Sequence, residues 1–342
     1  MFSCNLSAVV DEKSPYISIK SVGSCTVLSL AFIFGVPGNI SVMWSIYGKL
    51  KNISVTVLLI GHLALADFLI LLTLPIWIYM LAVNKWVFGQ VFCKVLAYVI
   101  YSNLYVSVFL ITLLSIERFL AVFRPFQLQK WIRQRVFQKI TIFIWIASAL
   151  LGIHSIPFLS PIQNDQPFKC VLHEYTSNTQ KVAFILLETF VGFLIPFCII
   201  IVCYIYLWRK LREMKFVGKR KTDKIIVMVV GTYVICWIPY HIFNIVDVAS
   251  VLLGTCSLQG IVDIGGTIAG ALVFINSCLN PLFYFYYAFK MKSPTKIFRL
   301  NMLFENIFGM ETEQNPSENK ENTTERTNKD IIEMASSDLQ MA

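Results

Sequence analysis

The side chains with the most chemical potential in this sequence are charged groups inside long apolar stretches. Asp67, Glu188 and the adjacent pair Glu117 and Arg118 are all embedded in this way. A charge in hydrocarbon is costly unless it is paired, so ionisable residues at such positions usually mark functional sites. The chemistry open to them is proton or cation binding by a buried carboxylate, and the breaking of an ion pair.

Glu117 and Arg118 predict a switch, because an acid beside a base can neutralise it in a resting state and release it later. The alternative interpretation is that Arg118 only extends to the lipid headgroups. Asp67 also has two interpretations. Either it shares a cation with neighbouring oxygens, or it belongs to a polar core that holds only water.

Two prolines interrupt the last two apolar stretches. Pro239 follows Trp237 by two residues, and Pro281 directly follows Asn280. Proline removes a backbone donor and kinks a helix, so we expect both stretches to hinge. Trp237 lies beside the first hinge and is either a contact for a ligand or part of the packed core.

Helices that span a membrane must position these residues. Hydrophobic residues make up 56% of the chain, charged residues only 14%, and the mean hydropathy is +0.67. Such a chain has too little polar surface for a soluble globule, and a helix of roughly 20 apolar residues crosses a bilayer. The sequence therefore predicts an all-α membrane protein, a seven-transmembrane-helix bundle with spans at residues 22–47, 54–82, 89–123, 136–157, 180–211, 221–250 and 260–286.

The distribution of basic residues predicts the orientation. Lysine and arginine concentrate in the connections after the first, third and fifth spans, which are cytosolic by the positive-inside rule. We expect a multi-pass protein of the plasma membrane with its N-terminus extracellular and its C-terminus cytoplasmic. The net charge of +9 then reflects topology and attraction to anionic membrane lipid, so no nucleic-acid partner is needed to explain it.

Composition divides the chain into an extracellular N-terminal segment, the seven-helix domain, a short amphipathic helix on the membrane surface and a disordered cytoplasmic tail. The N-terminal segment carries a glycosylation acceptor at Asn5. In the tail, Thr323 and Thr324 are candidate phosphorylation sites, or simply part of a solvated segment. The four parts cover residues 1–21, 22–287, 288–308 and 309–342.

The cysteines agree with this orientation. Cys93 and Cys170 both fall on the oxidising side of the membrane, where disulfides persist, and we pair them. Cys4 and Cys256 form a candidate second bridge, with Cys25 as a competing partner.

A set of positions distributed over the spans resembles the rhodopsin-like (class A) family of G-protein-coupled receptors. The resemblance extends over essentially the whole membrane portion of the chain. Glu117 stands where an aspartate is commoner, so the acid–base pair with Arg118 is preserved. Phe119 stands where a tyrosine is commoner. The positions are Asn39, Asp67, Glu117 with Arg118, Trp145, Pro196 with Tyr204, Cys236 to Pro239, and Asn280 with Pro281.

This resemblance implies a sodium pocket and a region that couples to heterotrimeric G proteins. Sodium is the only cofactor implied, as an allosteric ion, and arrestin and receptor kinases are implied as further partners. The residues implied to bind sodium are Asp67, Ser107, Asn276 and Asn280. Those implied in G-protein coupling and activation are Glu117, Arg118, Tyr204, Pro281 and Tyr284.

Several local strings, among them Gly35 to Asn39 and Phe123 to Phe126, look like the leukotriene B4 receptors of the chemoattractant branch. Ala97 stands where those receptors have a histidine. The arginines that they use are missing at the end of the fourth span and in the outer part of the seventh. By position, the ligand-binding residues implied are Tyr105, Glu188, Tyr240 and Asn244. Trp237 and His241 are further candidates for ligand binding, although a lone histidine such as His241 is more often a packing residue.

The implied function is that of a cell-surface receptor for a hydroxylated fatty acid similar to leukotriene B4, an eicosanoid, which activates inhibitory G proteins in chemotaxis. A peptide or another small ligand is the alternative within this class. From a different class, a transporter is less favoured because the seven unlike spans show no internal repeat. An enzyme is not predicted, because the sequence shows no nucleophile–base pair, phosphate loop or metal-ligand spacing.

Overall fold

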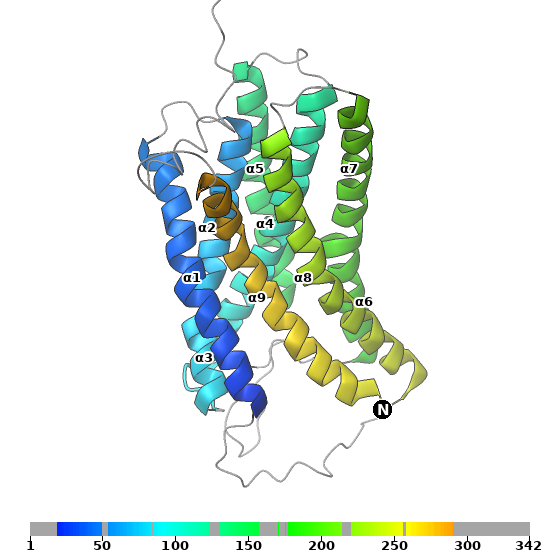
Figure 1. Ribbon diagram of the computed structural model, residues 1–342. Helices are drawn as coiled ribbons and strands as arrows, with labels where there is room; N and C mark the ends of the chain where they lie inside the picture. The colour runs from blue at the N-terminus through cyan, green and yellow to red at the C-terminus, as the bar shows by residue number, and fades with distance from the viewer. Residues whose placement is uncertain are drawn as a thin grey trace, which may run out of the picture. The chain divides into compact units, whose positions relative to one another are not determined.

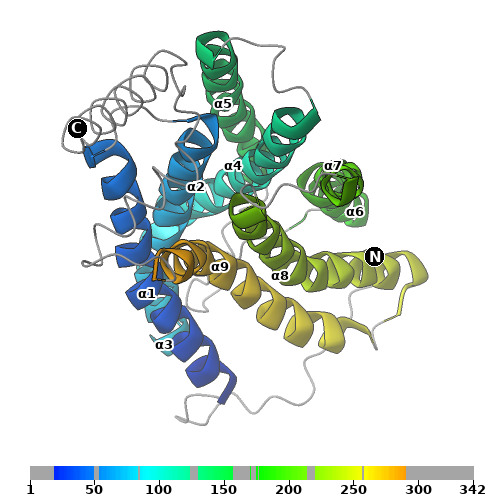
Figure 2. The same ribbon diagram turned by 45° about the horizontal axis from the view of Figure 1, so that its top comes forward.

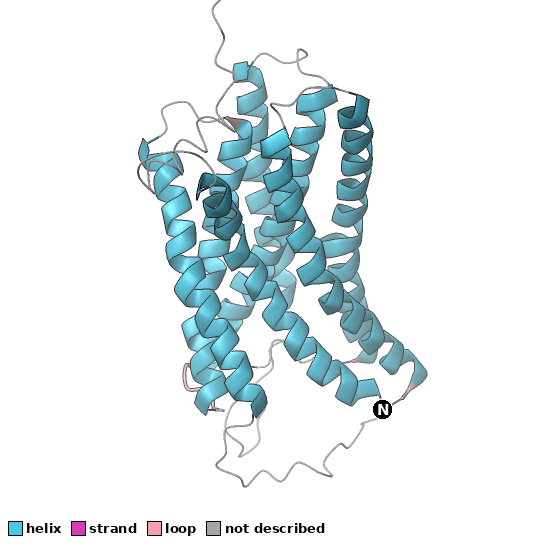
Figure 3. Ribbon diagram, viewed as in Figure 1, coloured by secondary structure: helices cyan, strands magenta, loops and turns pink. Residues whose placement is uncertain are grey.

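The computed structural model describes residues 19–49, 54–83, 85–123, 130–156, 170, 175, 177–213, 220–255 and 258–289. All regular structure in these ranges is helical (Figure 3). Residues 1–308 form one compact unit, which contains every described residue. The predicted sites at Asn5, Thr323 and Thr324, the predicted Cys4–Cys256 bridge, the amphipathic segment beyond Phe289 and the tail lie outside the described ranges.

Within the described ranges, seven helical stretches are long and apolar enough to cross a membrane, which confirms the predicted bundle (Figure 1). The second span combines α2 (Val55–Leu71) and α3 (Leu74–Val83). The fifth combines α6 (Asn178–Thr189), the π-helical η2 (Phe190–Leu194) and α7 (Ile195–Glu213). The other spans are built on α1 (Ile19–Lys49), α4 (Gly89–Phe123), α5 (Lys130–Gly152) with the 3-10 turn η1 (Ile153–Ser155) at its end, α8 (Arg220–Leu253) and α9 (Gln259–Phe289).

The second span breaks between Leu71 and Leu74 for a local reason. Pro75 has no backbone N–H and fits best in the first turn of a helix, which agrees with the start of α3 at Leu74. The Thr73 hydroxyl donates to the Ile70 carbonyl at 2.7 Å, and the Ile76 amide donates to the Thr73 carbonyl at 3.2 Å. These bonds help to pair the backbone carbonyls at the break between α2 and α3.

Pro196 has the corresponding effect on the fifth span. It cannot donate to the carbonyl of Gly192 four residues earlier, and the turn before it widens to the π-helical η2. The freed Gly192 carbonyl accepts a hydrogen bond from the Tyr233 hydroxyl of α8 at 3.3 Å. Gly192 also leaves room for α4, since a Cβ added at this residue would lie 3.2 Å from Leu104 of α4.

Helix α4 lies at the centre of the bundle and packs against α2, α5, α7 and α8 (Figure 2). Its fully buried side chains, such as Leu110 and Ile111, belong to one large core together with Tyr233 of α8 and Tyr284 of α9. Helix α1 packs on α9 instead. At Gly35 an added Cβ would lie only 2.6 Å from Leu71 and 2.8 Å from Cys278, so a small residue permits this contact.

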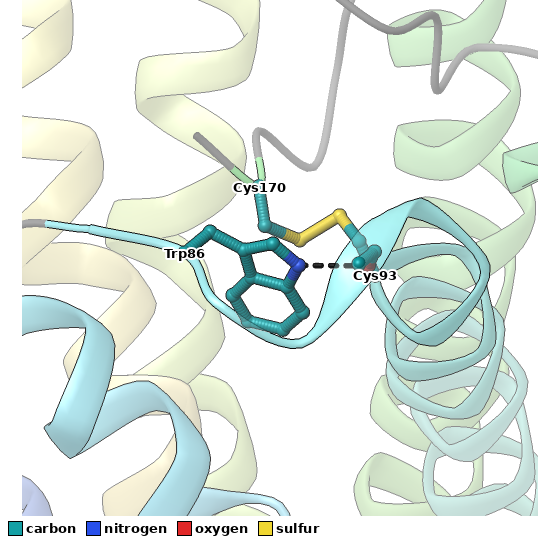
Figure 4. Close-up of a disulfide and its surroundings, with 4 residues drawn as sticks. Trp86, Cys93 and Cys170 are labelled. Carbon is teal, nitrogen blue, oxygen red and sulfur yellow. Dashed lines mark hydrogen bonds between the residues drawn. A yellow bond between two sulfur atoms is a disulfide. The ribbon is translucent and has the colours of Figure 1, made fainter. Parts of the chain in front are cut away.

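A disulfide joins Cys93, near the start of α4, to Cys170, with the two Cα atoms 5.7 Å apart (Figure 4). This confirms the predicted pair. Trp86 packs beside it and donates from Nε1 to the Gly89 carbonyl at 2.8 Å. Gly89 has φ +77°, a left-handed conformation that favours glycine. The proposed competitor Cys25 is a free thiol that lies against the Ile78 carbonyl.

We expect Cys93→Ala to lower the thermal stability and the amount of protein at the cell surface. The bridge spans a sequence separation of 77 residues, and losing such a constraint typically costs about 2–5 kcal/mol. Denaturation in detergent and surface labelling measure both effects, with Cys25→Ala as the control that breaks no bridge. The double variant Cys93→Ala/Cys170→Ala should be no worse than either single variant, and additive losses would contradict a shared bond.

Candidate functional site

One end of the bundle, called the disulfide end below, contains a cavity of about 420 Å³. Side chains of α1, α2, α3, α4, α8 and α9 line it. No acidic, basic or histidine side chain is among the described residues that do so. The lining is mainly aromatic and aliphatic, with hydroxyl and amide groups at Ser24, Asn103, Ser107, Asn244 and Asn276. Such a composition suits a largely apolar ligand that carries a few uncharged polar groups.

The predicted ligand residues divide between this cavity and the packing behind it. Trp237, Tyr240 and Asn244 of α8 line the cavity. Tyr105 does not; it is fully buried, and its ring stacks on Phe109 with centroids 6.0 Å apart. The reason is helical phase, since α4 turns Tyr101, Leu104 and Ser107 toward the cavity and Tyr105 away from it.

Glu188 and His241 lie behind the cavity wall, between α6 and α8. Tyr240 donates its hydroxyl to Glu188 Oε1 at 2.7 Å, and Glu188 is 1% exposed. The His241 ring stacks on the Phe193 ring with centroids 4.5 Å apart, and His241 Nδ1 lies 3.3 Å from the Thr189 hydroxyl. Glu188 can therefore act on a ligand through Tyr240, which it orients.

A second polar pair lies two turns farther along both helices. Lys181 Nζ of α6 is 2.7 Å from Asp247 Oδ1 of α8, and both side chains are mostly buried. Tyr175 lies nearby. Burial raises the pKa of its phenol above the ordinary value, and the carboxylates of Glu188 and Asp247 raise it further, so the group stays protonated. Sequence patterns missed this pair, although a lysine at the start of one span and an aspartate near the end of the next were a usable signal.

Of the predicted sodium residues, Asp67 and Asn280 are in contact, and Ser107 and Asn276 both line the cavity. Asn280 Nδ2 donates to Asp67 Oδ2 at 2.8 Å, and both residues are almost completely buried. Asp67 Oδ1, Ser107 Oγ, Asn276 Oδ1 and Asn280 Oδ1 have no hydrogen-bond partner among the described residues. Carboxylate, hydroxyl and amide oxygens are what a hard cation prefers, so this set fits sodium and equally accommodates water.

At the opposite end of the bundle, called the Arg118 end, Glu117 and Arg118 form an ion pair. Arg118 Nε lies 3.0 Å from Glu117 Oε2. The same oxygen accepts a hydrogen bond from the Thr56 hydroxyl of α2 at 3.0 Å. Thr56 and Glu117 are 2% and 3% exposed, so the bond is shielded from water. Thr56 has no recognisable spacing to Glu117 in the sequence, and only the packing of α2 on α4 brings them together.

The remaining residues implied in activation lie in or against the main core. Tyr284 is 1% exposed and Tyr204 is half-buried against the same cluster. Pro281 lies inside α9 and Pro239 inside α8, and both helices continue past them.

Comparison with known proteins decides the class. Residues 38–284 match the model of the family "7 transmembrane receptor (rhodopsin family)". The chain belongs to the rhodopsin family. Human leukotriene B4 receptor 1 is 32% identical over 273 residues, which cover 79% of this chain and 77% of the relative. The type-1 angiotensin II receptors of Bos taurus and human are 36% and 35% identical over 279 residues, which cover 78% of this chain and 77% of each relative.

Membership of the rhodopsin family makes this protein a multi-pass receptor of the plasma membrane and not an enzyme. Its partners are a ligand and a G protein. The family does not define the ligand, because the relatives above are receptors named for chemically different molecules.

We expect Thr56→Val to raise basal nucleotide exchange by this rhodopsin-family receptor. The substitution removes the hydrogen bond from Thr56 to Glu117 Oε2, and a hydrogen bond worth about 1 kcal/mol would shift the resting equilibrium about fivefold. Binding of GTPγS to membranes without agonist, at matched receptor density, measures the effect. Thr56→Ser keeps the hydroxyl and should behave like the wild type. Equal basal rates in all three proteins would assign Thr56 to packing alone.

We expect sodium to stabilise the purified receptor through Asp67. The melting temperature should be higher in sodium chloride than in choline chloride, and Asp67→Asn should remove that difference because it removes the charge that holds the ion. Asp247→Asn is the matched control, since it neutralises a carboxylate outside the cluster. A sodium effect that persists in Asp67→Asn would place the ion elsewhere.

Proposed function

We propose that this protein is a cell-surface receptor for a hydroxylated fatty acid of the leukotriene B4 type, and that it promotes nucleotide exchange on inhibitory heterotrimeric G proteins in chemoattractant signalling. The observation that carries this proposal is the mainly apolar cavity, which has no charged side chain among its described lining residues and has buried donors without partners, such as the indole N–H groups of Trp77 and Trp237. The relationship to human leukotriene B4 receptor 1 supports it.

The cavity suits the chemistry of such a ligand. Its aromatic and aliphatic side chains would bury a hydrocarbon chain, and burial contributes about 0.8 kcal/mol for each CH₂ group. The indole N–H groups of Trp77 and Trp237 have no partner among the described residues, and both side chains line the cavity. Ligand hydroxyl oxygens would satisfy them. Because none of the described lining residues is a cation, the ligand carboxylate would stay at the aqueous mouth.

The orientation of the chain follows from the disulfide in this proposal. A bridge between Cys93 and Cys170 persists on the oxidising side of the membrane, which puts the disulfide end and the N-terminus outside. The Arg118 end and the C-terminus are then cytoplasmic, as the basic connections also favour. Arrestin and receptor kinases would act on the cytoplasmic tail, with Thr323 and Thr324 as the candidate sites.

In this proposal, α8 would transmit the conformational change from the cavity to the Arg118 end. A ligand that prefers one arrangement of Trp237 and Tyr240 shifts the equilibrium between resting and active bundles. Movement of α8 about Pro239, with α9 flexing at Pro281, would open the Arg118 end, release Arg118 from Glu117 and expose a surface for the G protein. Tyr204 and Tyr284 would repack in that transition, and sodium at Asp67 would stabilise the resting state.

A peptide ligand is the second candidate. The type-1 angiotensin II receptors have slightly higher identity to this chain than the leukotriene B4 receptor does. Glu188 and Asp247 also place carboxylates near the cavity wall, where basic groups of a peptide would be attracted.

We expect leukotriene B4 to stimulate GTPγS binding in membranes that contain the receptor and inhibitory G proteins. Arachidonic acid, which has the same number of carbons without hydroxyl groups, should act at least about tenfold more weakly because it leaves the cavity donors unpaired. Tyr240→Phe should lower leukotriene B4 potency, since it breaks the bond to Glu188, whereas the exposed Tyr79→Phe should not. A response to angiotensin II but to no fatty acid would favour the peptide alternative.

A further inference from the structure

Two glycines give one wall of the cavity an unusual surface. Gly266 and Gly270 are four residues apart on α9, hence on one face of the helix, and both line the cavity. If either carried a Cβ, no heavy atom of the described residues would lie within 4 Å of it. This part of the cavity wall therefore consists of helix backbone without side chains, next to space that no described side chain fills.

Helix packing does not explain this pair. Small residues four apart in membrane helices usually allow two helices to approach closely. That explanation holds for Gly35, and for Gly265, where a Cβ would clash with the Phe243 ring. Gly266 and Gly270 have no such neighbour among the residues that the structure describes, and no left-handed backbone. Glycine nevertheless stabilises a helix less than alanine does.

The side chains around this wall are suited to hydrocarbon. Leu28 of α1, Met80 and Leu81 of α3, and Phe274 of α9 line the same cavity, together with the small hydroxyl of Ser24. The half of α9 that carries the glycines diverges from α1 in both views of the bundle (Figures 1 and 2). No charged side chain is among the described lining, so the charged end of a ligand has no partner here.

Trp77 supplies an independent indication of a ligand. Its side chain lines the cavity and is only 8% exposed, and its indole N–H has no partner among the described residues. The neighbouring Trp86, whose ring centroid is 6.3 Å away, donates its N–H to the Gly89 carbonyl. A buried donor without an acceptor is costly, and an oxygen of a ligand would remove that cost.

We propose that Gly266 and Gly270 form a subsite for the terminal hydrocarbon segment of an acyl ligand, which lies against the α9 backbone while a chain hydroxyl accepts a hydrogen bond from Trp77. The inference rests on the proposed function and specifies which part of the fatty acid this wall takes. The missing side chains set the length of chain that the cavity accepts.

Competition binding on the full-length receptor in membranes tests the subsite. The probes are leukotriene B4 and analogues shortened by two or four carbons at the methyl end. The wild type should prefer the full-length acid. Gly270→Leu and Gly266→Leu should weaken binding of the full-length acid about tenfold, because roughly two methylene groups of the ligand would lose their burial. The shortened analogues should keep their affinity. The control is Gly231→Leu, at another glycine with open space that does not line the cavity.

Trp77→Phe tests the hydrogen bond. It should reduce the affinity of hydroxylated acids and leave that of arachidonic acid unchanged. An unchanged chain-length preference in both leucine variants would overturn the subsite while the fatty-acid function stands. If the wild type binds none of these acids, the subsite and the proposed function fail together. Retained affinity of the shortened analogues shows that the leucine variants are folded.

Discussion

The hydrogen bond from Asn280 to Asp67 is the contact on which the arrangement of the bundle most depends. Lipid offers no partner to a polar side chain, so such groups must find each other inside the protein. This requirement fixes the rotation of α2 and α9 about their axes. Asn39 does the same for α1, since its Nδ2 donates to the Gly35 carbonyl and to the Ser277 carbonyl of α9. Large apolar residues such as Phe143 and Ile235 are left on the outside, where lipid covers them.

The Asp67 cluster also separates two regions with different packing. Toward the Arg118 end, Leu110, Ile111 and Tyr284 fill a dense core. Toward the disulfide end the helices enclose the cavity, which reaches down to Ser107 and Asn276. A ligand in the cavity therefore lies directly above the groups that a cation would bind. Along the α6–α8 seam, the Lys181–Asp247 and Glu188–Tyr240 pairs connect the same two helices two turns apart, so displacement of Tyr240 strains both helices together.

Much of this arrangement follows from the sequence because its causes are local. Apolar length defines the spans, and the shared side of Cys93 and Cys170 defines the bridge. Charged residues in apolar surroundings singled out Asp67, Glu117 and Glu188. Placement relative to the cavity was not readable, because it depends on helix rotation: Tyr105 turns into the core and Glu188 stands behind Tyr240. No sequence pattern marks Thr56 or Trp77, because the groups around them come from other helices. The α9 glycines are not marked either, because their position on the cavity wall depends on the fold.

The π-helical turn before Pro196 has a consequence for the whole fifth span. A π turn holds one more residue than an α turn, which shifts everything that follows by about 100° around the axis. Glu188 on one side of the turn and Tyr204 on the other are therefore oriented independently, each toward its own surroundings. The π turn therefore sets the rotation of the second half of the span relative to the first half. A deletion of one residue within 190–194 would restore a regular α-helix. In that helix either Glu188 or Tyr204 could keep its present orientation, but not both.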